Sequence, residues 1–171
     1  MIFVQELSEK LYDEGWRNIA NVDFSAAVIR LMSSRSAERR HMTCTIIFAA
    51  SSKLVFNLHL GHEMNVLDLK FPDDSFDVAI DKGTIDALMV EVKDVWNPPE
   101  TVVQNVLLEL SEVYRVLKPG GRFVYITFGQ PHFRRRYLER FSWHLRIDTV
   151  GDGFQYFVYI MTKPLDVPTK E

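Results

Sequence analysis

The stretch "FPDDSFDVAIDKGTIDALM", residues 71–89, contains each step of one α/β unit. "FPDDS" has the proline and the aspartates of a turn, and Phe76 to Ile80 has the composition of a buried strand. Asp81 and Lys82 give this strand a polar end, and Thr84 to Val92 has the spacing of a short helix. A buried strand that leads through a short polar loop into a helix is typical of α/β proteins with a parallel sheet.

The N-terminal part shows a helix, a strand and a second helix start. "ELSEKLYDEG" (6–15) has Leu7 and Leu11 one helical turn apart and ends on a glycine, which predicts a helix. "NIANVDFS" (18–25) is a short apolar run that reaches Asp23 and predicts a strand. Ser25 stands where the N-cap of the next helix belongs.

Residues 44–62 break this regular order. They contain two β-rich runs, Ile46–Phe48 and Leu54–Leu58, where the α/β pattern needs one strand. Met64 to Leu67 then has the composition of a strand end. We therefore treat 44–62 as an irregular insertion.

The C-terminal half is again regular. Pro98 and Pro99 precede an amphipathic helix, "ETVVQNVLLELSEVYRVL" (100–117), which "KPGG" ends. A strand over 122–128, a helix over 130–141 and a hairpin over 143–162 follow. These elements predict one domain over residues 1–171, a three-layer α/β sandwich with a mostly parallel sheet and a C-terminal antiparallel hairpin.

The composition sets limits on function. The chain has 171 residues and a net charge of −3, which gives no general attraction to nucleic acid or to an anionic membrane. Cys44 is the only cysteine, which excludes an internal disulfide and suits a reducing compartment. The stretch 44–60 is the most apolar, but polar residues interrupt it and it is too short to span a bilayer. We expect a cytoplasmic protein that acts on neither membranes nor nucleic acid.

Polar residues follow the predicted strands, and ligands of open parallel sheets bind at the carboxyl ends of strands. An acidic side chain such as Asp23 can accept hydrogen bonds from both hydroxyls of a ribose, and Asn65 can pair with the edge of an adenine. Lys82 can meet a ligand carboxylate. Each also has a structural explanation, since Asp23 can cap a helix, Asn65 can form a turn and "DKG" (81–83) can be a polar strand exit.

Five segments together resemble the class I S-adenosylmethionine-dependent methyltransferases, a Rossmann-like fold. They are most similar to the lysine methyltransferases that act on translation elongation factor 1-alpha, and "SFD" with "DKGTIDAL" is their most distinctive part. The segments are "VDFS" (22–25), "FPDDSFDVAIDKGTIDALM" (71–89), "LSEVYRVLKPGGRFVYITF" (110–128), "PHFRRRY" (131–137) and "GDGFQYFVYIM" (151–161). The resemblance extends over residues 7 to about 40 and 65 to about 163.

This resemblance implies S-adenosylmethionine as the cofactor and a protein substrate, possibly elongation factor 1-alpha. The cofactor-binding positions that it implies are Asp23, Phe24, Asn65, Val66 and Lys82.

The implied reaction is an in-line displacement in which a neutral lysine nitrogen attacks the sulfonium methyl group. Asp81 is a candidate to help the lysine lose its proton, and Thr127, Phe128 and Gln130 are candidates to line the acceptor entrance.

The N-terminus departs from the family pattern. The family has a strand and a glycine-rich loop directly before "LSEKLYDEG" (7–15), where "MIFVQ" (1–5) stands here, and no glycine precedes Gly15. The resemblance therefore implies an N-terminally truncated fold that lacks its central strand. Either "MIFV" or one of the extra runs within 44–60 could fill that gap. An alternative transcript or gene model is one explanation, and the rival hypothesis for function is an impaired or inactive relative that acts through protein contacts.

Two other patterns do not change this interpretation. His59, His62 and Glu63 lie close together, but no cysteine supports them and their spacing is not that of the helical zinc protease motif, so we predict no metal site. "FRRRYLER" (133–140) is basic and aromatic, and in an acidic chain we interpret it as a solvated helix face or a contact to an acidic protein.

Overall fold

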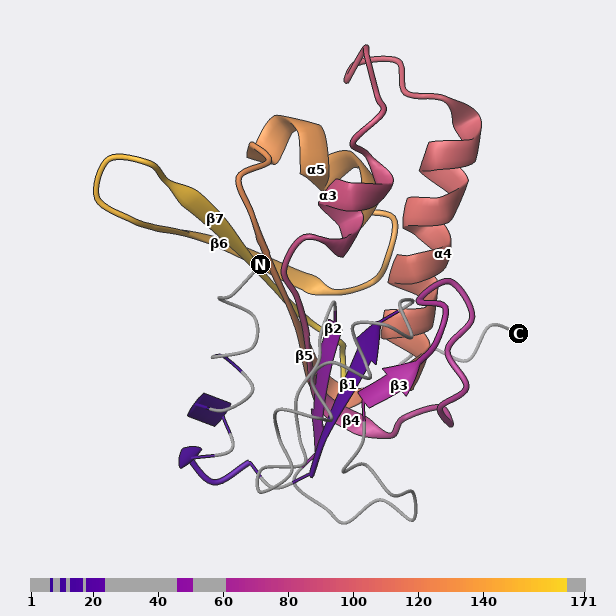
Figure 1. The fold of residues 1–171 in the computed structure, drawn as a ribbon, viewed down its shortest axis with the longest axis vertical. Coiled ribbons are helices and arrows are strands. Elements are labelled where there is room, and N and C mark those ends of the chain that lie inside the picture. The colour runs from indigo at the N-terminus through magenta and orange to yellow at the C-terminus, as the bar shows by residue number, and fades with distance from the viewer. Residues whose placement is uncertain are drawn as a thin grey trace.

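The computed structural model describes residues 7, 10, 11, 13–16, 18–23, 46–50 and 61–165, and for 46–50, 61 and 62 it describes the backbone alone. A mixed sheet runs through these residues, with helices along one side (Figure 1). The order of the strands across the sheet is β3 (Gly61–Glu63), β1 (Asn18–Asp23), β2 (Ile46–Ala50), β4 (Phe76–Asp81), β5 (Leu117–Thr127), β7 (Tyr156–Thr162) and β6 (His144–Val150).

The pairing of the strands shows which segment takes the place of the central strand that the family pattern has and this chain lacks. β1 pairs in parallel with β3, and β4 pairs in parallel with β5. Between these two pairs lies β2, which runs antiparallel to both β1 and β4. The expectation that an extra run within 44–60 replaces the central strand is thus confirmed for Ile46–Ala50. Residues 1–5 and the second run, 54–58, lie outside the described residues.

At the other edge, β6 and β7 form the antiparallel hairpin that the sequence predicts, and β7 pairs with β5. The sheet thus combines parallel pairs with antiparallel strands on both sides of the β4–β5 pair. The predicted fold class, a Rossmann-like α/β sheet with a C-terminal hairpin, is confirmed, with an additional antiparallel strand in its centre.

Within the described residues, three helices pack on one face of the sheet: α3 (Thr84–Leu88), α4 (Glu100–Val116) and α5 (Pro131–Leu138). Figure 1 shows α3 and α5 beside the upper part of α4. The strands give alternate side chains to this face, because successive residues of a strand point to opposite sides. The buried residues of this main core include Ala20, Val22, Ala79, Val106, Leu110, Val113, Phe123, Tyr125 and Tyr159.

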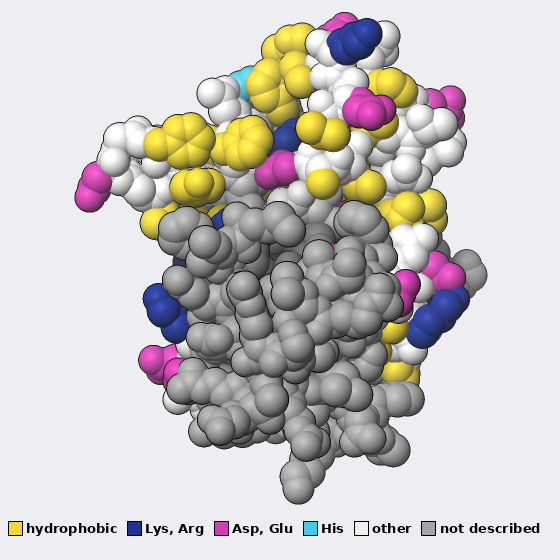
Figure 2. All heavy atoms as spheres, viewed as in Figure 1, with side chains coloured by type: hydrophobic (Ala, Val, Ile, Leu, Met, Phe, Trp, Pro, Cys, Tyr) yellow, Lys and Arg dark blue, Asp and Glu magenta, His cyan; other side chains and the backbone are white. Residues whose placement is uncertain are grey.

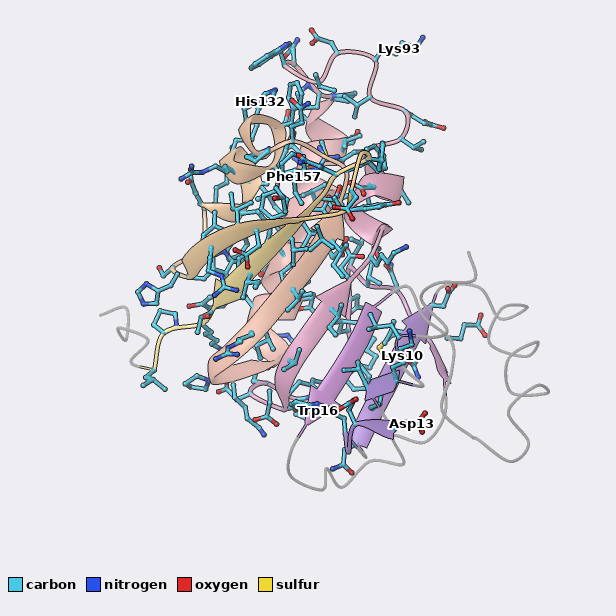
Figure 3. All side chains as sticks on the ribbon, turned by 90° about the vertical axis from the view of Figure 1, so that its left-hand side faces the viewer. Lys10, Asp13, Trp16, Lys93, His132 and Phe157 are labelled. Atoms are coloured by element: carbon cyan, nitrogen blue, oxygen red, sulfur yellow. The ribbon has the colours of Figure 1, made fainter. Side chains whose placement is uncertain are left out.

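The other face has a smaller apolar cluster. Ile19 and Ile80 are buried there against Leu7, Leu11 and Trp16 of the N-terminal segment. Figure 3 shows Lys10, Asp13 and Trp16 on the β1–β2 part of the sheet. Helix layer, sheet and N-terminal segment therefore form three layers, in agreement with the predicted three-layer sandwich.

Several predicted boundaries differ from the structure. α3 ends at Leu88, whereas the sequence predicts a helix up to Val92, and β3 ends at Glu63, just before the predicted 64–67. "KPGG" belongs to β5, since the N–H of Gly120 donates to the carbonyl of Lys163 over 2.9 Å. Pairing with the C-terminal strand region thus extends β5 through residues that, by their composition, predict a turn.

In the part of the chain that the structure describes, none of the helices combines the length and the apolar composition needed to cross a bilayer.

Candidate functional site

The sheet register brings the predicted strand ends to one edge. Asp23 of β1 pairs with Glu63 of β3, and Ile46 at the start of β2 pairs with both Val22 and Asp81. Because one strand separates them, Asp23 and Asp81 lie about 10 Å apart along this edge. The polar ends of β1, β3, β4 and β5 therefore point the same way, as the sequence predicts for a binding edge.

Asp23 is the last residue of β1 and is only 7% exposed. Its carbonyl accepts a hydrogen bond from the N–H of Met64 over 3.0 Å, which ties the end of β1 to the segment after β3. Asp23 is therefore a buried residue at the edge of the sheet. Phe24 lies outside the described residues, so its predicted role stays a prediction.

Asn65 and Val66 follow β3 directly. The side-chain oxygen of Asn65 accepts the N–H of Leu67 over 3.0 Å, and its carbonyl accepts the N–H of Asp68 over 3.0 Å. Asn65 is exposed, and Val66 is partly buried against the main core. Asn65 is thus a turn residue, the structural alternative given above, and it lies beside the end of β1.

Asp81 ends β4 and fixes the start of α3. Its two carboxylate oxygens accept the N–H groups of Thr84 over 2.8 Å and of Ile85 over 3.1 Å. The side chain is fully buried, and this burial raises its pKa from 3.8 to about 6. A carboxylate that is buried and bonded in this way acts as a structural cap. Its predicted catalytic role stays a prediction.

Lys82 and Gly83 form the bend between β4 and α3. Lys82 is partly buried and comes directly after the buried end of β4. Gly83 has a φ of 107°, a left-handed conformation that side chains disfavour. The "DKG" segment therefore combines a cap, a lysine at the edge of the sheet and a glycine that turns the chain into α3.

The predicted acceptor entrance follows β5. Thr127 is 1% exposed, Phe128 is 60% exposed and Gln130 is exposed. The hydroxyl of Thr127 donates to Asp86 over 2.7 Å and accepts the N–H of Gly129 over 2.8 Å. The segment therefore alternates between buried, bonded residues and residues that face solvent.

Sequence reasoning missed Asp86 and Arg134. Asp86 accepts hydrogen bonds from Tyr125 over 2.6 Å and from Arg134 over 2.9 Å. Arg134 is 8% exposed, although the sequence interpretation made the basic run a solvated helix face or a contact to an acidic protein. For Arg134 that interpretation is wrong, because it lies three and four residues before the buried Tyr137 and Leu138, on the inner face of α5. This spacing was the signal that could have found it.

Glu109 is a third missed residue. It is fully buried in α4, and neither carboxylate oxygen has a hydrogen-bond partner among the described residues. Burial, with smaller contributions from the charges of Asp81 and Asp86, raises its pKa well above the usual value. Glu109 follows Val106 by three residues, so the helical period of the sequence already placed it on the inner face.

Exposed aromatic side chains gather near this edge. Trp96 is 67% exposed, and its ring stacks on His132 at 5.8 Å and meets Phe133 edge-on at 5.1 Å. Figure 2 shows hydrophobic side chains across the upper part of the molecule, in the region that α3, α5 and the β6–β7 hairpin occupy in Figure 1. Phe154 and Tyr156, at 65% and 41% exposure, form a pair near the tip of that hairpin.

Within the described residues, no three histidine, cysteine, aspartate or glutamate side chains gather in a way that could hold a metal ion. His59 lies outside that part of the chain, and the side chain of His62 is not described, so the prediction of no metal site there stays a prediction.

Comparison with protein families identifies the chain. Residues 4–125, which include β1, β2, β4 and most of β5, match the family model described as "Methyltransferase domain". The chain belongs to the methyltransferase domain family. This methyltransferase domain contains the polar strand ends, α3 and Asp86 described above.

Relatives with known names agree with this assignment. The chain is 37% identical over 159 residues to mouse "EEF1A lysine methyltransferase 4", covering 92% of this chain and 56% of the relative. It is 33% identical over 178 residues to human "eEF1A lysine and N-terminal methyltransferase", covering 95% of this chain and 22% of the relative. The methyltransferase chain thus spans about half, or less, of the length of these relatives.

Solved structures show the same fold. PH0226 protein from Pyrococcus horikoshii OT3 matches with a TM-score of 0.58 at 16% identity, over 91% of this chain and 76% of that one. Geranyl diphosphate C-methyltransferase from Streptomyces coelicolor A3(2) matches with a TM-score of 0.57 at 18% identity, over 91% and 67% of the two chains.

Proposed function

We propose that this chain is an S-adenosylmethionine-dependent methyltransferase that methylates a lysine side chain of a translation factor, with elongation factor 1-alpha as the first candidate. The proposal includes a single catalytic domain over residues 1–171 and a cytoplasmic location, since the proposed acceptor works in translation. Membership of the methyltransferase family and the names of the two relatives support it. The observation that carries it is the shared edge at which β1, β4 and β5 end in Asp23, Asp81 and Thr127, with Lys82 directly after Asp81.

The residues at this edge fit the adenosine part of the proposed cofactor. A carboxylate that ends a buried strand can accept both ribose hydroxyls, as proposed for Asp23. The side chains of Asn65 and Val66 lie beside that strand end, because the N–H of Met64 bonds the carbonyl of Asp23. They offer an amide and an apolar contact to an adenine.

The methionine part of the cofactor fits this edge differently from the adenosine part. In the family pattern, a glycine loop directly before residues 7–15 lets the backbone approach this part of the cofactor, and "MIFVQ" (1–5) stands at that place in this sequence. β2, which takes the central place in the sheet, runs antiparallel and brings its first residue, Ile46, to the binding edge. Lys82, in the bend after β4, is the proposed partner for the carboxylate of this part of the cofactor.

When bound, the cofactor supplies an electrophilic methyl group. The protein has to align the acceptor nitrogen with this group and keep water away. In our proposal, Thr127, Phe128 and Gln130 guide the acceptor lysine. Both carboxylate oxygens of Asp81 are bonded to α3, so the lysine proton can leave to solvent or to the acceptor protein instead.

A second candidate function is an impaired or inactive relative that acts by binding proteins. The antiparallel β2 favours this candidate. Its carboxyl end lies at the opposite edge of the sheet, so it cannot lead into a glycine loop and a helix at the binding edge.

Calorimetric and thermal-shift titration of the chain with S-adenosylmethionine separates the two candidates. Binding at 100 times Kd should raise the free energy of unfolding by about 2.7 kcal/mol. Asp23→Ala should abolish this response, because it removes the ribose acceptor. Glu63→Ala is the matched control, since Glu63 pairs with Asp23 in the neighbouring strand and its side chain is exposed.

An absent response at millimolar cofactor would support the second candidate. An unchanged response in Asp23→Ala would remove the ribose assignment while leaving cofactor binding intact.

A further inference from the structure

We call residues 127–130 the entrance segment. A network of hydrogen bonds joins α3, β5 and α5 at this segment. Asp86 of α3 lies at its centre and accepts hydrogen bonds from Tyr125 at 2.6 Å, Thr127 at 2.7 Å and Arg134 at 2.9 Å. The side chains of Asp86 and Arg134 are 13% and 10% exposed. The stability of a charged pair that is largely buried depends on each of its hydrogen bonds.

The direction of each hydrogen bond in this network is determined. A carboxylate can only accept hydrogen bonds, so the hydroxyls of Tyr125 and Thr127 both donate to Asp86. The Nε–H of Arg134 donates to the Tyr125 oxygen over 3.0 Å, and the N–H of Gly129 donates to Thr127 Oγ1 over 2.8 Å. Asp86 is therefore the acceptor on which the other members depend.

Gly129 makes the close packing of this network possible. A Cβ atom at this position would lie 2.5 Å from Nε and 2.6 Å from Cζ of Arg134. The carbonyl of Gly129 accepts a hydrogen bond from Tyr159 over 2.7 Å, so both backbone polar groups of this residue are bonded to buried partners. The guanidinium of Arg134 can lie against the chain here only because no side chain intervenes.

Phe128 stands between these two fixed residues and points outward. Thr127 is 1% exposed and Gly129 is buried, whereas Phe128 is 60% exposed. An aromatic side chain held in place by its neighbours loses little conformational freedom when it binds. The network therefore presents one apolar side chain to solvent at the predicted acceptor entrance.

We propose that Asp86 is a positioning residue for the protein acceptor: through Thr127 and Arg134 it fixes the entrance segment so that Phe128 contacts an apolar surface of the acceptor next to the target lysine. This inference rests on the proposed function and adds the residues that select the acceptor. Trp96 and His132 lie on the same part of the molecule, where Figure 3 shows His132 on α5, and extend the aromatic surface available to a protein.

The test compares Thr127→Val with Thr127→Ser in the full chain. Valine has nearly the shape of threonine but no hydroxyl, whereas serine keeps the hydroxyl that joins Asp86 to Gly129. We expect amide hydrogen exchange at Gly129 to become about tenfold faster in Thr127→Val, since its acceptor is lost, and to stay near the wild-type rate in Thr127→Ser.

Methylation of elongation factor 1-alpha gives the second readout. In Thr127→Val, kcat/KM for this acceptor should fall by about 100-fold while the Kd for S-adenosylmethionine stays within about threefold. Phe128→Ala should raise the acceptor KM by about tenfold without changing exchange at Gly129. Glu139→Gln, which alters an exposed ion pair of the same region with Arg135, is the control and should leave all these values unchanged.

Equal values for wild type and Thr127→Val in both the exchange rate at Gly129 and kcat/KM for the acceptor would overturn the proposal. So would an equal loss of cofactor affinity and acceptor turnover, which indicates general damage to the fold. If the wild-type chain transfers no methyl group, the proposed function fails, and the exchange rates at Gly129 alone then decide whether the network positions the segment.

Discussion

At the scale of single residues, burial of the Glu109 carboxyl group is electrostatically unfavourable when the group is ionised. Its carboxyl group is fully buried in α4, and neither oxygen has a partner among the described residues. Its raised pKa means that the folded protein keeps a proton which the unfolded chain releases once the pH exceeds about 4.5. The folded state then binds more protons than the unfolded state, so the free energy of unfolding falls as pH rises.

We predict that Glu109→Gln reduces this fall. Glutamine does not titrate, so the variant should exceed wild type in stability by about 1–3 kcal/mol at pH 8 and by less at pH 5. Asp81, whose pKa is raised to about 6, also makes the free energy of unfolding fall as pH rises toward 6, and it does so in both proteins. Urea denaturation at pH 5, 6.5 and 8 measures the difference.

Glu100→Gln is the control for this comparison, because Glu100 is an exposed glutamate of the same helix. Parallel pH profiles for wild type and Glu109→Gln would show that Glu109 ionises in the folded protein as it does in water.

The three arginines of "FRRRY" show what sequence can decide at this scale. Residue type alone indicates a solvated face, which holds for Arg135 and Arg136. Arg134 is buried because its spacing to Tyr137 places it on the inner side of α5. Its partner Asp86 is 48 residues away in the chain, so no local pattern could reveal the pair.

At the scale of elements, Arg115 joins α4 to the segment that leads into β4. Its guanidinium donates to the carbonyls of Leu69 and Phe71, each over 2.8 Å, and to the carboxylate of Glu112. The hydrogen bond from Arg115 lowers the pKa of Glu112. Three contacts that point in different directions need the planar group of arginine.

We therefore predict that Arg115→Lys lowers the free energy of unfolding by about 1–3 kcal/mol, because one ammonium group cannot reach Leu69, Phe71 and Glu112 together. Arg146→Lys tests the same chemical change at an exposed ion pair on β6 and should stay within about 0.5 kcal/mol of wild type. Denaturant unfolding measures both variants. If both variants lost the same small amount, the bonds of Arg115 would have no role in holding this segment.

The boundaries of α4 and β5 show what local sequence patterns can and cannot predict. The sequence predicts α4 closely, because two prolines precede it and its apolar residues keep one period. "KPGG" has the composition of a turn, yet it is part of β5. The chain from the C-terminal hairpin pairs with it there, and this pairing partner is far away in sequence.

For the whole molecule, β2 is the decisive element. It pairs on both sides, with Phe48 opposite Ala20 of β1 and Ala79 of β4. Without it, β1 and β4 would each have an unpaired edge in the middle of the sheet, with exposed backbone donors and acceptors.

We predict that Phe48→Pro destabilises the chain by about 3 kcal/mol or more beyond Phe48→Ala, because proline lacks the N–H and is excluded from central strands. Both substitutions remove the same side chain, so the difference between them isolates the backbone. Thermal unfolding and hydrogen exchange at Ala20 and Ala79 give the measurement. Equal stability of the two variants would place residue 48 outside the sheet.

The sequence by itself determined the α/β class, the C-terminal hairpin, the helix that packs on the sheet and the polar residues at the strand ends. These features depend on hydrophobic periodicity, turn residues and caps within a few positions of one another. The tertiary structure alone decided which run fills the centre of the sheet and that this strand runs antiparallel. It also decided that Asp86, Tyr125, Thr127 and Arg134 meet beneath the entrance segment. Such contacts join residues tens of positions apart, and their free energy arises only when the packed core removes both partners from water.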